Sequence, residues 1–586
     1  MFDVVLEGGS VIDGTGAPAR RADVGIIGDR IAAVGLDLGP ARKTLDCKGL
    51  LVTPGWVDMH THYDGQVTWD PHCTPSGWHG VTTVVFGNCG VGFAPCRAED
   101  RDWLINVMEG VEDIPGAALN EGIQWTWETF PEFLDALDAL PLALDIGAQI
   151  PHSAVRGYVM GRKASEDAAA SDDEIAQMKA IVAEGLEAGA LGFTTSRTSL
   201  HKTAEGVHVA GTFAEEREIN GICEALGETG KGLFQLADEH LKVPQDMAWL
   251  RKIAEDTGRP VCVNLSQTDF MPKLWEGVLP VLDQARADGV PLYAQAAGRA
   301  IGILMCWRGT AHPFALHPTW KALSQRPWDE IVAALGTPEV RQALLSEAPD
   351  EGNVFEQYVT QFFHKMFPVD AGYEPSADQS IAAVAKTQGR TPLEVAYELM
   401  CADDCAGFLY FPLFNYSDNA LDVLHQMHTH PQIRMGLSDG GAHCGAICDG
   451  GMPTFMITHW TRDRARGERL PLPWMVHRQT QQTARFYGLM DRGVVAEGYL
   501  ADLNVIDYEA LSIGMPKMVF DLPAGGRRLI QRAEGYRYTL KRGQITMVDG
   551  EATGALPGAL VRGEQSGPAV EVAPVADVPH GVIAAK

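Results

Sequence analysis

The chain has 586 residues, of which 46% are hydrophobic and 21% are charged, the composition of an ordinary folded protein with a sizeable core. Acidic residues outnumber basic ones by 76 to 47, and the resulting net charge of −29 disfavours extensive contact with nucleic-acid phosphates. The N-terminus lacks a basic segment followed by an apolar one, and no apolar run reaches about 18 residues. We therefore expect a cytoplasmic protein that binds neither nucleic acid nor membrane.

The N-terminal segment predicts short strands. Residues 2–35 carry β-branched stretches separated by Gly, Asp and Pro, and the same pattern returns over 501–511 and 536–554. We expect residues 1–56 and 498–586 to fold together as one small sheet domain. Residues 567–586 are rich in Pro, Ala and Val, which predicts an extended or loosely packed tail.

The segment PGWVDMHTHYD, residues 54–64, carries the first candidate site. His60 and His62 are two positions apart, so a strand would place both imidazoles on the same face. Two imidazoles on one face can bind one metal ion. The spacing alone fits equally well with two ordinary polar residues at a strand end.

Apolar runs alternate with longer helical patterns between the two ends of the chain, as in βα units with a parallel sheet. One helix is predicted over Asp172–Ala188, with Ser171 as its N-cap. The predicted strands cover residues 57–62, 82–88, 142–150, 190–196, 232–237, 260–266, 290–296 and 433–439. Eight such strands predict an α/β fold with a (β/α)8 TIM-like barrel over 57–497. Its insertions, at about 92–139 and 299–432, are expected to shape or cover the substrate pocket.

The carboxyl ends of barrel strands face one shared cavity, which favours a functional role for residues placed there. Cys89 follows the second strand, where its thiolate can bind a metal, although a small buried side chain explains it equally well. Asp439 follows the eighth strand, where it can bind a metal and accept a proton from water. The alternative for Asp439 is a turn residue bonded to its own backbone.

Four further residues are candidates for substrate binding. Arg197 and Arg299 follow the fourth and seventh strands, and a guanidinium there can hold a carboxylate with two parallel hydrogen bonds; a structural ion pair is the alternative. His201 and His443 also follow predicted strands. Each could be a metal ligand, a general acid, a substrate contact or an ordinary polar loop residue.

Seven sequence segments together resemble the amidohydrolase superfamily, and within it the D-aminoacylase (N-acyl-D-amino-acid deacylase) group. They are FDVVLEGGSVIDGTG, PGWVDMHTHYD, GVTTVVFGNCGVGFAP, TWETFPEFLDALDAL, EGLEAGALGFTTS, MGLSDGG and TARFYGLMDRGVVAEGYLADLNVID. The resemblance covers nearly the whole chain. It implies a metal-dependent (β/α)8 barrel with a small β-sandwich domain built from both chain ends. It also implies that His60, His62, Cys89 and Asp439 match metal or catalytic positions.

The chain departs from this family at two metal-binding histidines. Where relatives carry one after the fifth strand, this sequence has Gln235, and after the sixth it has Ser266 and Gln267. The fourth strand also lacks a terminal lysine that could become a carboxylated bridge between two metal ions, since Lys202 lies several residues further on. A second metal is therefore doubtful. We expect one zinc ion, which suits mixed nitrogen, oxygen and sulfur ligands.

Together these features predict metal-dependent hydrolysis of the amide bond of an N-acyl amino acid, with Asp439 as general base and D-selectivity implied by the resemblance alone. Two alternatives remain. A cyclic amidohydrolase acting on a hydantoin or lactam ring would use much the same residues. A non-catalytic binding descendant would account for the missing histidines. The acyl group, the amino acid and a homo-oligomeric state are left open by the sequence.

Overall fold

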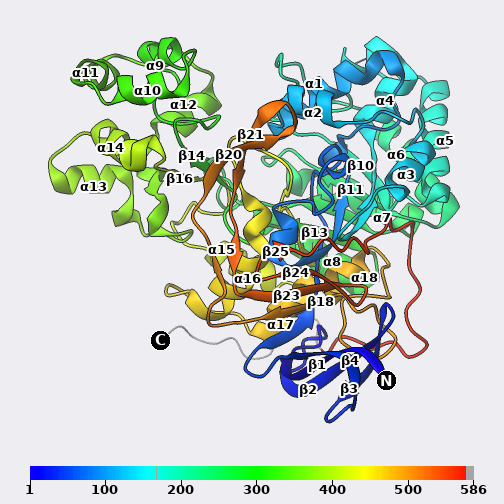
Figure 1. Cartoon of the computed structure of the whole chain (residues 1–586). Coiled ribbons are helices and arrows are strands. Elements are labelled where there is room, and N and C mark those ends of the chain that lie inside the picture. The colour runs from blue at the N-terminus through cyan, green and yellow to red at the C-terminus, as the bar shows by residue number, and fades with distance from the viewer. Residues whose placement is uncertain (167, 576–586) are drawn as a thin grey trace.

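The computed structural model describes residues 1–166 and 168–575 (Figure 1). Its two chain ends share one nine-stranded sheet, ordered β25-β24-β23-β18-β5-β1-β2-β3 with β4 paired to β1. The strands are β1 Phe2–Val11, β2 Arg20–Ile27, β3 Arg30–Gly35, β4 Ala41–Asp46, β5 Leu51–Pro54, β18 Leu503–Ile506, β23 Tyr536–Lys541, β24 Gln544–Val548 and β25 Glu551–Ala552. The ends join where β5 and β18 pair antiparallel, with Val52 opposite Val505. Both valines are buried in one apolar cluster with Leu6 and Leu540. The described part of the predicted tail, residues 567–575, has neither helix nor strand, and residues 576–586 lie outside the described chain.

Two all-parallel sheets lie between the chain ends, with orders β6-β7-β8 and β17-β13-β12-β11-β10-β9. Their strands are β6 Trp56–Asp58, β7 Val81–Phe86, β8 Asp145–Ala148, β9 Ile150–Pro151, β10 Gly192–Ser196, β11 Leu233–Ala237, β12 Val261–Asn264, β13 Leu292–Ala296 and β17 Ile433–Met435. Each of the eight predicted strand regions therefore contains a strand. Main-chain contacts connect the two sheets. Gln149 N–H donates to the Phe86 carbonyl (2.9 Å), and Thr61 forms a parallel bridge with Gly440.

Helices follow most of these strands: α4 His152–Met160, α5 Asp172–Ala188, α6 Glu216–Thr229, α7 Val243–Thr257, α8 Leu279–Asp288, α16 Met452–Thr458, α17 Leu472–Gln479 and α18 Gln481–Phe486. The predicted helix over 172–188 is confirmed as α5. Ser171 caps it by accepting a hydrogen bond from Glu174 N–H, while the Glu174 side chain returns a bond to the cap. Met178, Val182 and Leu186 form its buried stripe. Among the described residues, no helix is both long enough and apolar enough to cross a membrane.

The predicted strands run too far at their carboxyl ends. The first ends at Asp58 rather than residue 62, and the eighth ends at Met435 rather than residue 439. Beyond these points the backbone leaves the extended region, since Leu437 and Asp439 have φ values of 56° and 48°. A positive φ is uncommon for residues other than glycine, and such residues often lie at functional sites.

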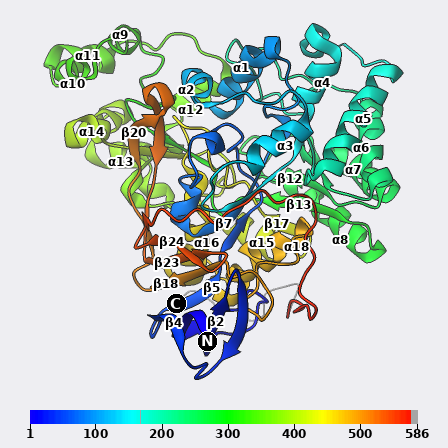
Figure 2. The same ribbon diagram turned by 45° about the vertical axis from the view of Figure 1, so that its right-hand side comes forward.

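Both predicted insertions contain their own elements. The first holds α1 Arg101–Glu112, α2 Gly116–Gly122 and α3 Phe130–Asp138. The second holds β14 Gly302–Met305, α9 Pro318–Leu323, α10 Trp328–Leu335, α11 Pro338–Ser346, α12 Val354–Gln361, β15 Phe367–Pro368, α13 Ile381–Gln388, α14 Pro392–Cys405, β16 Leu409–Pro412 and α15 Asp422–Thr429. Much of the second packs around a separate core that includes Trp307, Phe314 and Tyr397. In Figure 1 and Figure 2, α9–α11 lie on the opposite side of the molecule from α5–α7.

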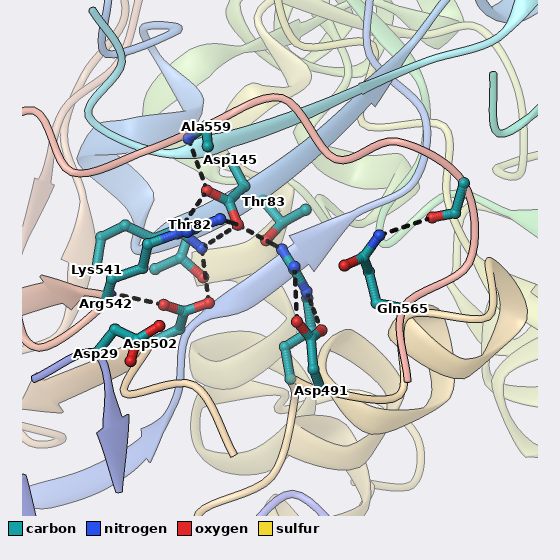
Figure 3. A network of polar contacts seen from close by, with 12 residues as sticks. Asp29, Thr82, Thr83, Asp145, Asp491, Asp502, Lys541, Arg542, Ala559 and Gln565 are labelled. Carbon is teal, nitrogen blue, oxygen red and sulfur yellow. Dashed lines mark hydrogen bonds and ion pairs between the residues drawn. The ribbon is translucent and has the colours of Figure 1, made fainter. Parts of the chain in front are cut away.

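A buried ion network connects the sheet built from both chain ends to the parallel strands (Figure 3). Asp145 on β8 lies 2.8 Å from Lys541 on β23 and 2.7 Å from Arg492. Lys541 also pairs with Asp502 at 2.7 Å. Four short strands complete the C-terminal region: β19 Ser512–Ile513, β20 Lys517–Leu522, β21 Gly526–Ile530 and β22 Ala533–Glu534.

Candidate metal centre

The four predicted metal ligands come together. The ligand atoms of His60, His62 and Cys89 lie within 4.8 Å of one another, and all three residues are buried. Cys89 Sγ is 3.4 Å from His60 Nε2. Asp439 Oδ1 lies 3.3 Å from His60 Nε2 and 3.9 Å from His62 Nε2. Two imidazoles and one thiol therefore form one close group, and the Asp439 carboxylate lies beside the two imidazoles.

Main-chain hydrogen bonds hold the loops after β6 and β17 next to each other. Asp439 N–H donates to the His60 carbonyl (3.1 Å), and His62 N–H donates to the Gly440 carbonyl (2.8 Å). The loop carrying Cys89 is pressed against β10: a Cβ on Gly90 would lie 2.7 Å from Thr195 Cα. Only glycine permits so close an approach, so the position of Cys89 depends on Gly90.

The second ring nitrogen of His60 faces two amide side chains. His60 Nδ1 lies 3.2 Å from Gln295 Oε1 and 2.9 Å from Gln235 Nε2. Gln295 is held in turn by donating to Asn264 Oδ1 (2.6 Å). A proton on Nδ1 that is donated to Gln295 Oε1 leaves the lone pair of Nε2 for a metal, whereas a hydrogen bond accepted from Gln235 Nε2 requires the other tautomer. Gln235, where the family resemblance predicts a histidine, thus contacts the ring at the nitrogen away from Cys89.

Ser266 and Gln267, at the other departure from the family, have separate surroundings. Ser266 lines the cavity described below, and its Oγ is buried without a hydrogen-bond partner. The Gln267 side chain instead accepts a hydrogen bond from Ser417 N–H (3.0 Å) and donates to the Pro272 carbonyl (3.2 Å). Gln267 is therefore occupied in holding neighbouring loops.

Glu112 is a site residue that the sequence did not reveal. It ends α1, is 1% exposed, and places Oε1 3.2 Å from His62 Nδ1. Its other oxygen lies 3.7 Å from His443 Nε2. A carboxylate against the far nitrogen of a ligating histidine fixes the ring and raises its basicity. No local signal identifies Glu112, because a glutamate within an inserted helix is an ordinary surface residue.

Burial controls the charge of these groups. It lowers the pKa of His60 to about 3 and the pKa of His62 well below the usual value, so both rings are neutral near pH 7 and able to bind a metal. Burial, followed by repulsion from other carboxylates, raises the pKa of both Asp439 and Glu112. The described ion-pair partners of these two carboxylates are histidines. Two acidic groups without a cationic partner, beside neutral imidazoles and a thiol, fit a divalent cation of the zinc type.

The cluster opens into a cavity of about 900 Å³ that His60, His62, Cys89 and Asp439 line. The two predicted substrate-contact histidines also line it. His201 Nδ1 lies 2.8 Å from Ser196 Oγ, and burial lowers the His201 pKa to about 3. The His443 side chain is 26% exposed. Both are placed to contact a molecule in this cavity.

The prediction that Arg197 and Arg299 face the cavity is wrong, since neither residue lines it. β13 ends at Ala296, and the loop that follows turns Arg299 into the interior. There it donates to Asp449 Oδ1 (2.9 Å), and its guanidinium lies 3.7 Å from the centre of the Tyr373 ring. Arg197 lies over the Trp249 ring at 5.1 Å. Arg299 therefore makes a structural ion pair, the alternative given above, while Arg197 packs on an aromatic ring.

Comparison with known proteins identifies the family. The model of the amidohydrolase family matches residues 43–547. The D-aminoacylase of Alcaligenes xylosoxydans xylosoxydans is 28% identical over 527 residues, which cover 86% of this chain and 88% of that protein. The N-acyl-D-aspartate deacylase of the same organism is 26% identical over 564 residues, covering 94% and 93%. A solved structure of D-aminoacylase with a binuclear metal centre superimposes with a TM-score of 0.64 at 25% identity, covering 96% of this chain and 100% of that one. The chain belongs to the amidohydrolase family.

Proposed function

We propose that this chain is a metal-dependent hydrolase that cleaves the amide bond of an N-acyl-D-amino acid. The observation that carries the proposal is the buried group of His60, His62 and Cys89 in a large cavity, with Asp439 beside both imidazoles. The D-configuration rests on the relatives, since proteins named D-aminoacylase, N-acyl-D-glutamate deacylase and N-acyl-D-aspartate deacylase each match more than four fifths of the chain.

His60, His62, Cys89 and Asp439 would hold one divalent ion, and their mixed donor atoms favour zinc. When bound, such an ion polarises an acyl carbonyl and lowers the pKa of an adjacent water toward about 7. Gln295 Oε1 lies 3.2 Å from the far nitrogen of His60, and Glu112 Oε1 lies 3.2 Å from that of His62. Each of these groups could support the histidine beside it when a metal is bound.

Asp439 is the group placed to move the proton. It accepts a proton from the attacking water as the new carbon–oxygen bond forms, and then delivers that proton to the amide nitrogen as the carbon–nitrogen bond breaks. The products are a free carboxylic acid and an amino acid with its amine restored. His201 and His443, which line the cavity, would contact the substrate.

The two alternatives have weaker support. Matches to allantoinases, which represent the cyclic amidohydrolases, cover 14% of the chain, compared with 86% for D-aminoacylase. A non-catalytic descendant has no need to keep a buried cluster of two imidazoles, a thiol and a carboxylate, because burying such polar groups without a ligand costs stability.

The fold proposal supports the same function. We propose that the parallel strands close into a (β/α)8 barrel over residues 57–497, and that residues 1–56 and 498–586 form a small β-sandwich. The Thr61–Gly440 bridge supports closure, and the shared nine-stranded sheet supports joining the chain ends. All eleven cysteines are free thiols, which supports a reducing, cytoplasmic location.

The test combines metal analysis with a substrate panel. Protein purified without chelator is expected to hold one zinc equivalent, and to hydrolyse N-acyl-D-amino acids faster than their L-isomers or cyclic amides. Two tightly held equivalents per chain would contradict the single-ion site. Turnover confined to hydantoins or lactams would show that the chain is a cyclic amidohydrolase and not a deacylase.

A further inference from the structure

The cavity has an apolar wall that the chemistry at Asp439 does not require. Ile301 and Ile303, at the start of β14, line it together with Leu413 and Phe414, which follow β16. All four belong to the second insertion, which Figure 1 shows in green to yellow. The cavity volume of about 900 Å³ lies near the upper end of the roughly 300–1,000 Å³ found for small-molecule sites. A substrate with only an acetyl group would leave much of this wall uncovered.

The apolar lining continues to the protein surface. Leu200, Val354 and Phe355 line the same cavity, yet they are 47%, 77% and 40% exposed. Val354 and Phe355 occupy the first turn of α12, which Asn353 caps by accepting a hydrogen bond from Glu356 N–H (3.0 Å). Clustered apolar side chains that remain exposed usually mark a binding surface. Apolar side chains therefore line this cavity both in the interior and at its exposed rim.

The charges in the cavity also limit the substrate. Glu109, Glu112, Asp113 and Asp439 line it, whereas its described basic lining consists of Lys202 and histidines, with no arginine. An acidic amino-acid side chain would meet four carboxyl groups. Lys202 offers an ammonium for the single carboxylate that every N-acyl amino acid carries. The remaining surface suits an uncharged, apolar group.

We propose that the substrates are N-acyl amino acids with a long aliphatic acyl chain, octanoyl or longer, which lies along this wall and rim. The proposal rests on the proposed deacylase function and specifies its substrate class. Each buried methylene contributes about 0.8 kcal/mol, or nearly fourfold in binding. Burial of half of the six methylenes that distinguish octanoyl from acetyl would therefore favour the octanoyl substrate by roughly 60-fold.

A chain-length series tests the proposal. The full-length protein, with its zinc content measured, is assayed on D-leucine acylated with acetyl, butyryl, hexanoyl, octanoyl and decanoyl groups. We expect kcat/KM to rise from acetyl to octanoyl by at least tenfold. Equal or falling values would overturn the chain-length proposal while leaving the deacylase function in place. Absence of turnover with every member would instead contradict the deacylase function.

Rim variants test where the acyl chain lies. Val354→Ser and Phe355→Ser change exposed side chains, so folding should be little affected. Each is expected to lower the octanoyl-to-acetyl ratio of kcat/KM severalfold. The matched control is Leu36→Ser, which changes a 64% exposed side chain outside the cavity lining and should leave the ratio unchanged. An unchanged ratio in both rim variants would show that the acyl chain does not lie along the rim.

Product binding provides a readout that needs no turnover. Calorimetric titration of the protein with octanoate and with acetate compares the same head group on two chain lengths. Tighter binding of octanoate, lost in part in Phe355→Ser, supports the acyl-chain surface even if the amide assayed is not hydrolysed. Equal affinities for the two acids would overturn it.

Discussion

Asp439 combines two roles in the proposed mechanism, because one of its oxygens lies within 4 Å of both imidazole Nε2 atoms. Asp439→Asn keeps the shape of the side chain but removes the proton acceptor. We expect kcat on an N-acyl-D-amino acid to fall by about 100- to 10,000-fold, with zinc content measured in the same preparation. A near-native rate would exclude Asp439 from proton transfer.

Glu112 should act through His62. Glu112→Gln replaces the carboxyl group that faces His62 Nδ1 with an amide, and loss of such a partner typically lowers metal affinity or activity by about 10- to 100-fold. Zinc affinity is measured by competition with a chelator. The control is Glu109→Gln, a change in the same helix and the same cavity whose side chain bonds Gly116 N–H instead. Equal zinc affinity in the two variants would show that Glu112 lines the cavity without supporting zinc binding.

The residues that the sequence identified share one property. His60, Cys89 and Asp439 each follow a parallel strand within a few positions, so strand order alone brings them together. Glu112 reaches the site from an inserted helix, and its approach depends on how that helix packs, which no local pattern specifies. Arg299 shows the converse. It follows a strand, yet its side chain turns to Asp449 because the loop direction depends on that partner.

Among elements, the strand interiors were predictable and their carboxyl ends were not. Apolar runs such as TTVVF identify β7 because burial on both faces requires continuous hydrophobic residues. The sequence GLSD looks equally extended, but Leu437 and Asp439 adopt positive φ. The tertiary bonds from this loop to His60 and His62 stabilise that conformation, and these long-range contacts are absent from a local sequence pattern.

The cap of α12 controls the rim of the cavity. Asn353→Ala removes the hydrogen bond to Glu356 N–H, a loss that usually costs about 1 kcal/mol. We expect amide hydrogen exchange in the first turns of α12 to accelerate by about fivefold, since these residues open locally. Ser171→Ala removes the equivalent cap of α5 and should accelerate exchange in α5 alone. Unchanged exchange in α12 would show that tertiary packing, not the cap, holds the rim.

At the scale of the whole molecule, Asp145 connects parts of the chain that are distant in sequence. Lys541 and Arg492 lie within 2.8 Å of its carboxylate, Arg542 within 3.2 Å, and Ala559 N–H donates to it (2.9 Å) (Figure 3). Asp145 and Lys541 are fully buried. Such a network stabilises the fold only while every charge keeps its partner.

Asp145→Asn should therefore be strongly destabilising, because it leaves buried cations without their shared carboxylate. We expect the free energy of unfolding to fall by about 3–5 kcal/mol, measured by urea titration at neutral pH. Asp135→Asn is the control, since Asp135 pairs with Arg562 at the surface and its side chain is 75% exposed. A similar small change in both variants would show that the network contributes little to stability.

The same network predicts how stability depends on pH. Burial would raise the pKa of Asp145, but the charges of Lys541, Arg492 and Arg542 together lower it below the ordinary value of 3.8. Because the pKa is lower in the folded state, the stabilisation is complete at pH values above the unfolded pKa and is lost as the pH falls below it. The asparagine variant cannot titrate at this position. The difference in unfolding free energy between the wild type and Asp145→Asn should therefore stay constant down to about pH 5 and shrink below about pH 4. Urea titrations across this range measure it, and a difference that stays constant at low pH would show that Asp145 does not keep its charge through these contacts.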